Sequence, residues 1–231
     1  MKNSYDLIAK NKQFDLKMGR ENKKEGVAML HREAILAAAE KLFTEKGFAE
    51  TTISDISAAS DYSRRTIYAY YLSKDDILHH IISKGLTSLR DDIKNALDES
   101  EDFLTRYRYI CRALKKYYED YPLSAESIIN AETGKASPDE FTPAVKNIFG
   151  LGEEINKLLA RFIEDGKTAG TVQNSTKIMP TVYVLWSSIS SLLTLTKTKG
   201  RFLSDFLALS QDEFMEYGFR QIINSILVER V

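Results

Sequence analysis

Residues 51–74 read TTISDISAASDYSRRTIYAYYLSK, and this stretch decides the fold of the N-terminal part of the chain. Thr52 and Asp55 have the Ser/Thr-x-x-acid spacing of a capping box, which predicts a helix that begins at Ile53. Ser63 is a good N-cap, so the sequence predicts a second helix that begins at Arg64. Two helices joined by a turn of three to four residues indicate a helix-turn-helix.

The second predicted helix carries hydrogen-bond donors and aromatic rings on its outer surface. Ile67 and Tyr71 are four residues apart and are expected to face the first helix. In a helix-turn-helix the first residues of the second helix reach base edges in the major groove, where arginine often binds guanine through two hydrogen bonds. The predicted DNA contacts are the two helix caps and the outward residues, which are Thr52, Ser63, Arg64, Arg65, Thr66, Tyr68, Ala69 and Tyr70.

A third helical segment follows the motif. Ser73 caps it through Asp76, which puts Lys74 at a helix N-terminus. Backbone N–H groups and an ammonium group together can hold one phosphate at such a place. We therefore predict that Lys74 is a phosphate contact.

The region from Arg32 to Leu78 resembles the DNA-binding domain of the TetR family of transcriptional regulators. Arg65 stands where the family commonly has glycine, which suggests an extra contact with a base or a phosphate. The resemblance covers about a fifth of the chain. The matching features, in chain order, are a first helix over 34–47, the Gly47-Phe48 corner, Thr51-Thr52 with Asp55-Ile56, and Ser63-x-x-Thr66-x-Tyr68-x-Tyr70-Tyr71-x-Ser73-Lys74.

The resemblance implies a C-terminal helical domain that encloses a small-molecule pocket and dimerises through its last two long helices. Small residues in these helices agree with a close four-helix seam, because they let helices approach one another. Aromatic residues could line the pocket, although aromatic residues at helical spacing also fit a packed core. The candidate pocket residues are Phe103, Tyr107, Tyr183 and Trp186, and the candidate dimer residues are Ser187, Ser190, Ser191, Phe214, Gly218, Ile222 and Ser225.

Apolar residues recur at three- and four-residue spacing through the rest of the chain, which predicts helices rather than strands. With the two motif helices, the predicted fold is all-α with about nine helices. The other predicted helices cover 27–46, 74–97, 103–118, 124–131, 141–165, 177–200 and 212–228. We predict three regions: a flexible basic N-terminal tail over 1–26, a helix-turn-helix domain over 27–75, and an effector-binding and dimerisation domain over 76–231.

The composition bears on DNA binding, on the cellular compartment and on a candidate membrane span. The chain has 32 basic and 33 acidic residues and a net charge of −1, so its overall charge does not favour DNA binding, which depends on where Arg64, Arg65 and Lys74 lie. Cys111 is the only cysteine, which favours a reducing, cytoplasmic compartment. Residues 178–196 carry no charge and nearly match a membrane span in length, but their seven Ser and Thr residues and Pro180 favour a buried helix.

The sequence contains no set of residues typical of an enzyme. His79 and His80 are adjacent, so they cannot bind one metal from a single helical face. No Gly-rich phosphate loop, His-Glu-x-x-His motif or nucleophile elbow is present. We expect no enzymatic activity, no cofactor and no metal.

Three interpretations remain. The first is a TetR-type homodimer that binds a pseudo-palindromic double-stranded DNA operator, acts as a repressor and is released by a small lipophilic ligand. The second is a DNA-binding dimer of the same fold without a small-molecule effector, controlled by a protein partner or by its own concentration. The third, an all-helical enzyme or a pure protein-interaction module, would leave Arg64, Arg65 and Lys74 unexplained.

Overall fold

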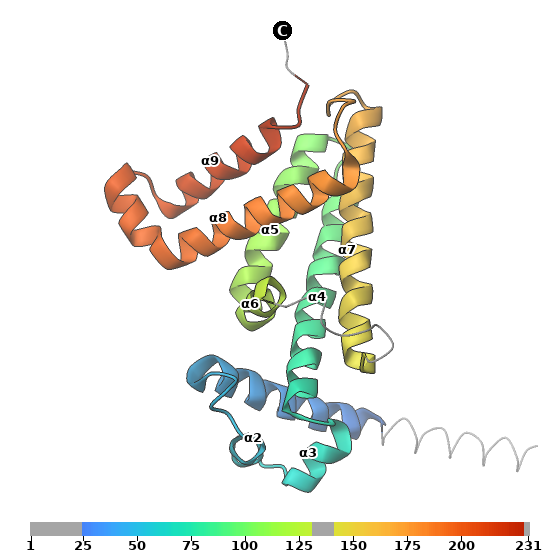
Figure 1. The fold of residues 1–231 in the computed structure, drawn as a ribbon, viewed down its shortest axis with the longest axis vertical. Helices are drawn as coiled ribbons and strands as arrows, with labels where there is room; N and C mark the ends of the chain where they lie inside the picture. Colours follow the sequence, from blue (N-terminus) through green and yellow to red (C-terminus); the bar gives the residue numbers. More distant parts are fainter. Residues whose placement is uncertain (1–24, 131–140, 229–231) are drawn as a thin grey trace, which may run out of the picture. The chain divides into compact units, whose positions relative to one another are not determined.

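The computed structural model describes residues 25–130 and 141–228, and these residues form nine helices and one isolated antiparallel bridge (Figure 1). The predicted all-α class is therefore confirmed. The predicted tail lies outside the described residues except for residues 25 and 26, which are helical. The helices are one over 25–46, α2 (Ile53–Ser60), α3 (Arg64–Tyr70), α4 (Lys74–Asp98), α5 (Phe103–Asp120), α6 (Pro122–Asn130), α7 (Pro143–Thr168), α8 (Ile178–Leu207) and α9 (Gln211–Asn224).

The chain divides between His80 and Ile81 into two compact units. Unit 1 contains the helix over 25–46, α2, α3 and the first turns of α4. Gly47 ends the first helix with a φ of +90°, a conformation that glycine adopts without strain, and its N–H donates to Phe43 O at 3.1 Å. Apolar side chains from all four helices form the core of unit 1, which contains Ile35, Ala39, Phe43, Ile56, Ile67, Tyr71 and Ile77.

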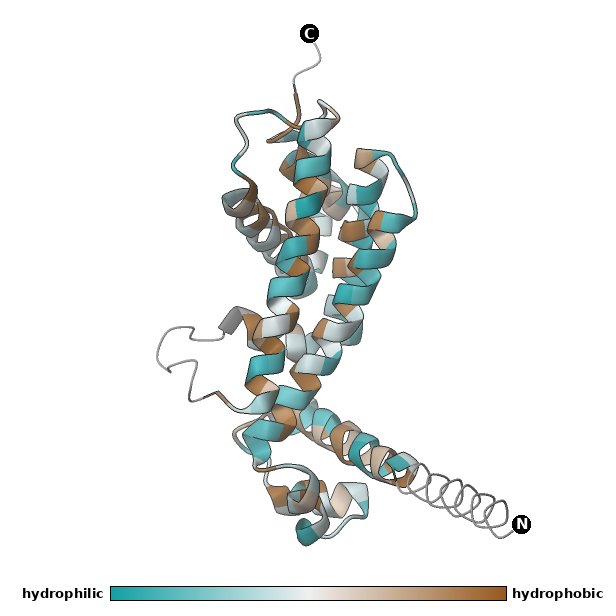
Figure 2. Cartoon of the chain, turned by 90° about the vertical axis from the view of Figure 1, so that its right-hand side faces the viewer, coloured by the Kyte–Doolittle hydropathy of each residue, from teal (hydrophilic) through white to brown (hydrophobic). Residues whose placement is uncertain are grey.

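Unit 2 is a bundle in which α8 packs against α5, α7 and α9. Hydrophobic and hydrophilic residues alternate along its long helices, as expected for helices that bury one side (Figure 2). Burial of apolar surface is the main force that holds such a bundle together. The core contains Tyr107, Ile110, Leu114, Ile155, Phe162, Ile163, Val182, Leu185 and Ile189.

The structure corrects two predicted helix ends. Gly200 was expected to end its helix, but α8 continues to Leu207. Gly200 is buried, and a Cβ atom at this position would lie 2.6 Å from Gln211 Cδ, so glycine here permits α9 to start close to α8. The helix predicted over 141–165 begins at Pro143 and continues through Gly166 to Thr168.

The last predicted helix is shorter than expected because its final residues pair with a distant loop. α9 ends at Asn224, and Leu227 forms the antiparallel bridge with Val172. Gln173 N donates to Ile226 O at 2.9 Å, and Val228 N donates to Thr171 O at 3.0 Å. These residues therefore close the loop between α7 and α8.

Within the described ranges one helix, α8, is long and apolar enough to cross a membrane. Only 28% of its most apolar window is buried, so the expectation of a buried helix holds for one side of α8 only. The buried side packs on the bundle through Val182, Leu185, Ile189 and Leu193. The opposite side exposes apolar residues such as Val184 and Phe202.

Candidate nucleic-acid interface

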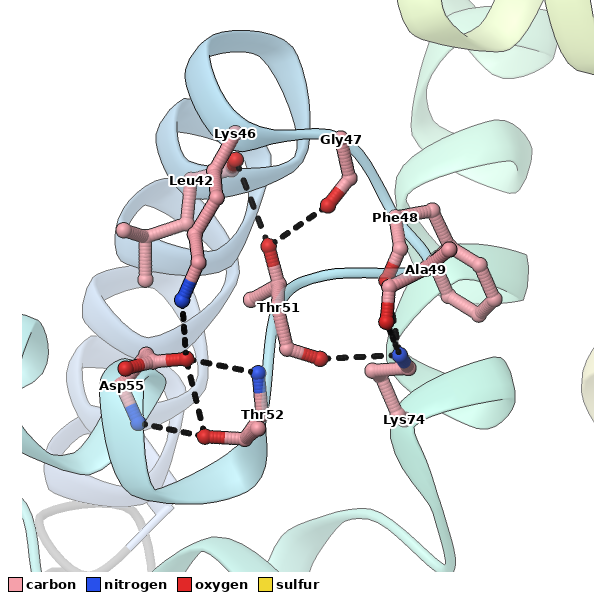
Figure 3. A network of polar contacts seen from close by, with 9 residues as sticks. All are labelled: Leu42, Lys46, Gly47, Phe48, Ala49, Thr51, Thr52, Asp55 and Lys74. Atoms are coloured by element: carbon pink, nitrogen blue, oxygen red, sulfur yellow. Dashed lines mark hydrogen bonds and ion pairs between the residues drawn. The ribbon is translucent and has the colours of Figure 1, made fainter.

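The first helix of the motif begins where the capping box predicts. Thr52 Oγ1 accepts from Asp55 N at 3.2 Å, and the Asp55 carboxylate accepts from Thr52 N at 2.8 Å (Figure 3). Lys46 Nζ lies 2.9 Å from Asp55 Oδ2 and joins the first helix to α2. The hydrogen bond from Lys46, followed by those from Thr52, lowers the pKa of Asp55 to about 2. Asp55 is therefore an anion at physiological pH and keeps this cap formed.

The turn between the helices is short and well connected. Asp61 adopts the left-handed conformation with a φ of 59°, which aspartate tolerates better than most residues. Ser57 Oγ donates to Tyr62 O at 2.6 Å and ties the turn back to α2. Ser63 then accepts from Thr66 N at 3.1 Å, so the predicted N-cap of α3 is confirmed.

The α3 helix buries one side and exposes the start of the other. Ile67 and Tyr71 are buried, in agreement with the prediction that they face inward. Arg64 and Arg65 are exposed at the first turn. Arg64 Nη1 reaches Ser54 Oγ at 3.5 Å, whereas Arg65 makes no hydrogen bond or ion pair to any described residue. Arg65 is therefore the arginine of this turn with the fewest internal constraints.

The other predicted DNA contacts divide into exposed and half-buried residues. Tyr68 and Ala69 are exposed, and Tyr68 retains 55% of its surface. Thr66 is half-buried, and its hydroxyl lies 2.9 Å from Ser63 Oγ. Tyr70 was predicted to lie outside, but it is half-buried with its hydroxyl 3.1 Å from His31 Nδ1. The sequence pattern did not indicate the role of His31, because no local spacing links it to Tyr70.

Lys74 differs from its predicted role. Its ammonium donates to Phe48 O at 2.7 Å, to Thr51 O at 2.8 Å and to Ala49 O at 3.3 Å (Figure 3). It also lies 4.4 Å from the centre of the Phe48 ring. We call this set of contacts the Lys74 clamp. An ammonium has three N–H donors, and all three have partners here. Lys74 therefore holds the loop before α2 and has no N–H donor left for a phosphate.

Thr51 supports the same loop. It is buried, and its hydroxyl donates to Gly47 O at 2.8 Å (Figure 3). Together with the Lys74 clamp, this bond orients the backbone that leads into the Thr52 cap. The position of α2 is therefore determined by polar contacts to backbone carbonyls as well as by apolar packing.

The four candidate pocket residues do not share one cavity. Tyr107 and Trp186 line a cavity of about 20 Å³ between α5, α7 and α8. Phe103 is buried and stacked on Phe162, with ring centres 4.3 Å apart. Tyr183 is 60% exposed, because it lies on the side of α8 that faces away from the bundle. The prediction was therefore wrong for Tyr183, and Phe103 is a core residue.

The candidate dimer residues are also divided. Ser190 is buried within the chain, and a Cβ atom on Gly218 would lie 2.5 Å from Leu192 Cδ2, so both serve packing inside unit 2. Ser187, Ser191 and Ser225 are exposed, and Phe214 and Ile222 are half-buried. An uncharged exposed side of α8, which we call the α8 outer face, was not predicted. It consists of the exposed Val184, Ser191, Leu195, Thr198, Phe202 and Phe206 and the half-buried Ser188, and their spacing of three and four residues was readable in the sequence.

Comparison with known proteins agrees with this geometry. Residues 35–81 match the model of the family described as bacterial regulatory proteins, tetR family. The uncharacterized HTH-type transcriptional regulator YvdT of Bacillus subtilis is 38% identical over 73 residues, which are 32% of this chain and 38% of that protein. The match thus spans well under two thirds of this relative.

Solved structures extend the likeness to both units. KstR2 of Mycobacterium tuberculosis, a ketosteroid transcriptional regulator, has a TM-score of 0.66 at 16% identity and covers 86% of this chain and 95% of its own. SmeT, the repressor of the Stenotrophomonas maltophilia multidrug efflux pump SmeDEF, has a TM-score of 0.63 at 14% identity and covers 86% and 91%. At these identities the likeness establishes the fold. The matched family consists of transcription regulators and not of enzymes. The helix-turn-helix region of the chain is therefore that of the tetR family of bacterial regulatory proteins, and both units share the fold of the solved regulators.

Proposed function

We propose that this protein is a homodimeric, cytoplasmic repressor that binds a pseudo-palindromic DNA operator through α3. The observation that carries the proposal is the exposed pair Arg64 and Arg65 at the start of a helix capped by Ser63. Side chains at this position of a helix-turn-helix reach base edges in the major groove. A dimer would bring two such helices to half-sites about 34 Å apart, one helical turn of DNA.

Arg65→Ala tests the reading of bases. The test uses a DNA fragment that the wild-type protein selects from a random pool. We expect the substitution to weaken the binding free energy for this fragment by about 1–3 kcal/mol and to relax the sequence preference at one base pair. Arg65 is expected to contribute this part of the binding free energy, because its guanidinium makes no hydrogen bond or ion pair to a described residue. Gel retardation with the selected fragment and with scrambled DNA measures the change.

Arg112→Ala is the matched control for this experiment. Arg112 is an exposed arginine on α5 in unit 2, so the substitution removes the same charge outside the motif. Its effect on the selected fragment should be small. Equal losses for the two variants would contradict base reading by Arg65, and failure of the wild-type pool to enrich any sequence would contradict the proposed function.

The α8 outer face supports the proposed dimer. Its residues carry no charge over more than five helical turns, and Phe202 and Phe206 retain 65% and 76% of their surface. Exposed aromatic residues in a contiguous uncharged stripe are typical of an interaction surface. The exposed Tyr217 of α9 adds a further aromatic ring to unit 2. We assign this side of α8, with α9, to the seam between two copies.

Phe202→Asp tests this seam. A carboxylate must lose its hydration when it is buried in an interface, so the variant is expected to be monomeric or to dimerise at least tenfold more weakly. Sedimentation velocity over a concentration series measures the equilibrium. Phe149→Asp is the control, because Phe149 is an exposed phenylalanine of α7, stacked on Phe141. A Phe202→Asp protein that dimerises like the control would contradict the assignment.

The small cavity in unit 2 bears on whether an effector binds. The lining of the small cavity is apolar and aromatic, which favours a lipophilic ligand. The cavity of about 20 Å³ is nevertheless far below the roughly 300–1,000 Å³ of ligand pockets, so a ligand would have to open it. This small volume favours the second candidate, a dimer of the same fold without a small-molecule effector. A screen of lipophilic compounds for reversal of DNA retardation separates the two.

A further inference from the structure

His31 contacts both ends of the segment that carries α3. It lies on the helix over 25–46, with Nδ1 3.1 Å from the hydroxyl of Tyr70, the last residue of α3. Its ring centre is 4.8 Å from that of Tyr62, in the turn before α3. One imidazole therefore joins the first helix to the beginning and the end of the helix proposed to read DNA.

The α3 helix needs such external support. It has seven residues, and helices this short are not stable by themselves in water. Ile67 is the only fully buried residue between Arg64 and Tyr70. A single buried residue in the middle of a two-turn helix does not fix the direction of the helix axis. Contacts at the two ends of α3 therefore determine its orientation.

Neighbouring contacts hold the C-terminal end of α3 on the same side. The Arg32 guanidinium lies 5.3 Å from the centre of the Tyr70 ring. Tyr71, which is buried, donates from its hydroxyl to Arg32 O at 3.2 Å. His31 and Arg32 thus bind two consecutive tyrosines at the end of α3, and His31 alone also reaches the turn before it.

We propose that His31 is a positioning residue for DNA recognition: with Tyr70 it sets the direction in which α3 presents Arg64 and Arg65. The inference rests on the proposed function, since it concerns how that function is performed. It also gives Tyr70 a role different from a direct phosphate contact. The Tyr70 hydroxyl could act through His31 or could bind a phosphate independently, and the two roles lead to different experimental results.

A double-mutant cycle separates these two roles. His31→Leu replaces the imidazole with an apolar side chain that cannot form the hydrogen bond, whereas Tyr70→Phe removes only the hydroxyl. We expect each change to weaken binding to the selected DNA fragment about tenfold, which corresponds to the loss of one hydrogen bond. The double variant should bind no more weakly than the weaker-binding single variant. Binding to scrambled DNA and its salt dependence should stay unchanged, because no phosphate contact is lost.

Two further variants complete the test. His31→Gln should recover part of the affinity, because an amide can still bond the Tyr70 hydroxyl. Tyr109→Phe is the control, since Tyr109 lies on α5 in unit 2, outside the motif, and makes no hydrogen bond to described residues. Additive losses in the cycle would overturn the inference, as would single variants that bind the selected fragment as tightly as the control does.

Hydrogen exchange on the free protein tests positioning without DNA. The amides of α3 should exchange faster in His31→Leu and in Tyr70→Phe than in the wild type and in Tyr109→Phe. Unchanged exchange would overturn the inference. If the wild type binds no DNA, the proposed function fails, and the exchange result still decides whether His31 holds α3.

Discussion

Gly166→Ala is expected to destabilise unit 2 by about 3 kcal/mol, although alanine is normally the better helix former. A Cβ atom at this position would lie 2.4 Å from Phe103 Cε2 and 2.7 Å from Val172 Cγ2. Phe103 cannot move aside easily, because it is buried and stacked on Phe162. Urea unfolding, followed by circular dichroism, measures the change in the free energy of unfolding.

Gly150→Ala is a control on the same helix. Gly150 is an exposed α7 residue, and a Cβ atom there meets nothing within 4 Å. This substitution should stabilise the protein by about 0.5–1 kcal/mol, because alanine loses less backbone entropy than glycine. The two changes should therefore have opposite signs. Equal effects would show that Gly166 is not required for the approach of Phe103 and Val172 to α7.

Lys74→Met is expected to destabilise unit 1 by about 2–3 kcal/mol, because three backbone carbonyls lose a charged donor. The loop before α2 would then lose its main polar anchor. Binding to the selected fragment and to scrambled DNA should fall together, in proportion to the fraction of folded protein. The salt dependence of the remaining binding should stay unchanged, because the clamp releases no counterions from DNA.

Lys46→Met provides the matched control. Its ammonium pairs with Asp55 at the surface, and exposed ion pairs contribute about 0–1 kcal/mol. A Lys74→Met protein that is as stable as this control, with a salt slope reduced by roughly one unit, would restore Lys74 as a phosphate contact. Thermal or urea unfolding, combined with binding across a salt series, distinguishes the two results.

The helix starts of the motif were predictable because capping is local. Thr52 with Asp55, and Ser63 with Thr66, bond within three residues of each other, so their spacing in the sequence contains the relevant information. The inward direction of Ile67 and Tyr71 was predictable for the same reason, since it follows from helical periodicity.

The roles of Lys74 and His31 depend on contacts that are distant in the sequence. Lys74 binds carbonyls 23 to 26 residues away, and His31 binds Tyr70 across 39 residues. A lysine at a helix N-terminus can serve a phosphate or a nearby loop, and only the folded backbone decides between them. The same holds for Gly166, whose close neighbours come from α5 and from the loop after α7.

The α8 helix marks another limit of sequence patterns. It carries apolar or small residues on both sides, so periodicity alone could not separate the buried side from the exposed one. Val182 and Leu185 pack inside, while Tyr183 and Val184 face away from the bundle. The assignment of Tyr183 to a pocket failed for this reason, and the small cavity beside Trp186 depends on packing volumes that no pattern specifies.

The bridge between Val172 and Leu227 sets the order in which a newly made chain can finish folding. A ribosome delivers the chain from its N-terminal end, and domains generally fold as units. Unit 1 has its caps, its core and the Lys74 clamp before residue 81, so it can fold while the rest is still being made. Val172 and the side of α8 that packs on α9 stay uncovered until residues 211–228 follow. A nascent chain would thus possess the unit proposed to read DNA before it could form the proposed dimer, which would make assembly a late step of biogenesis.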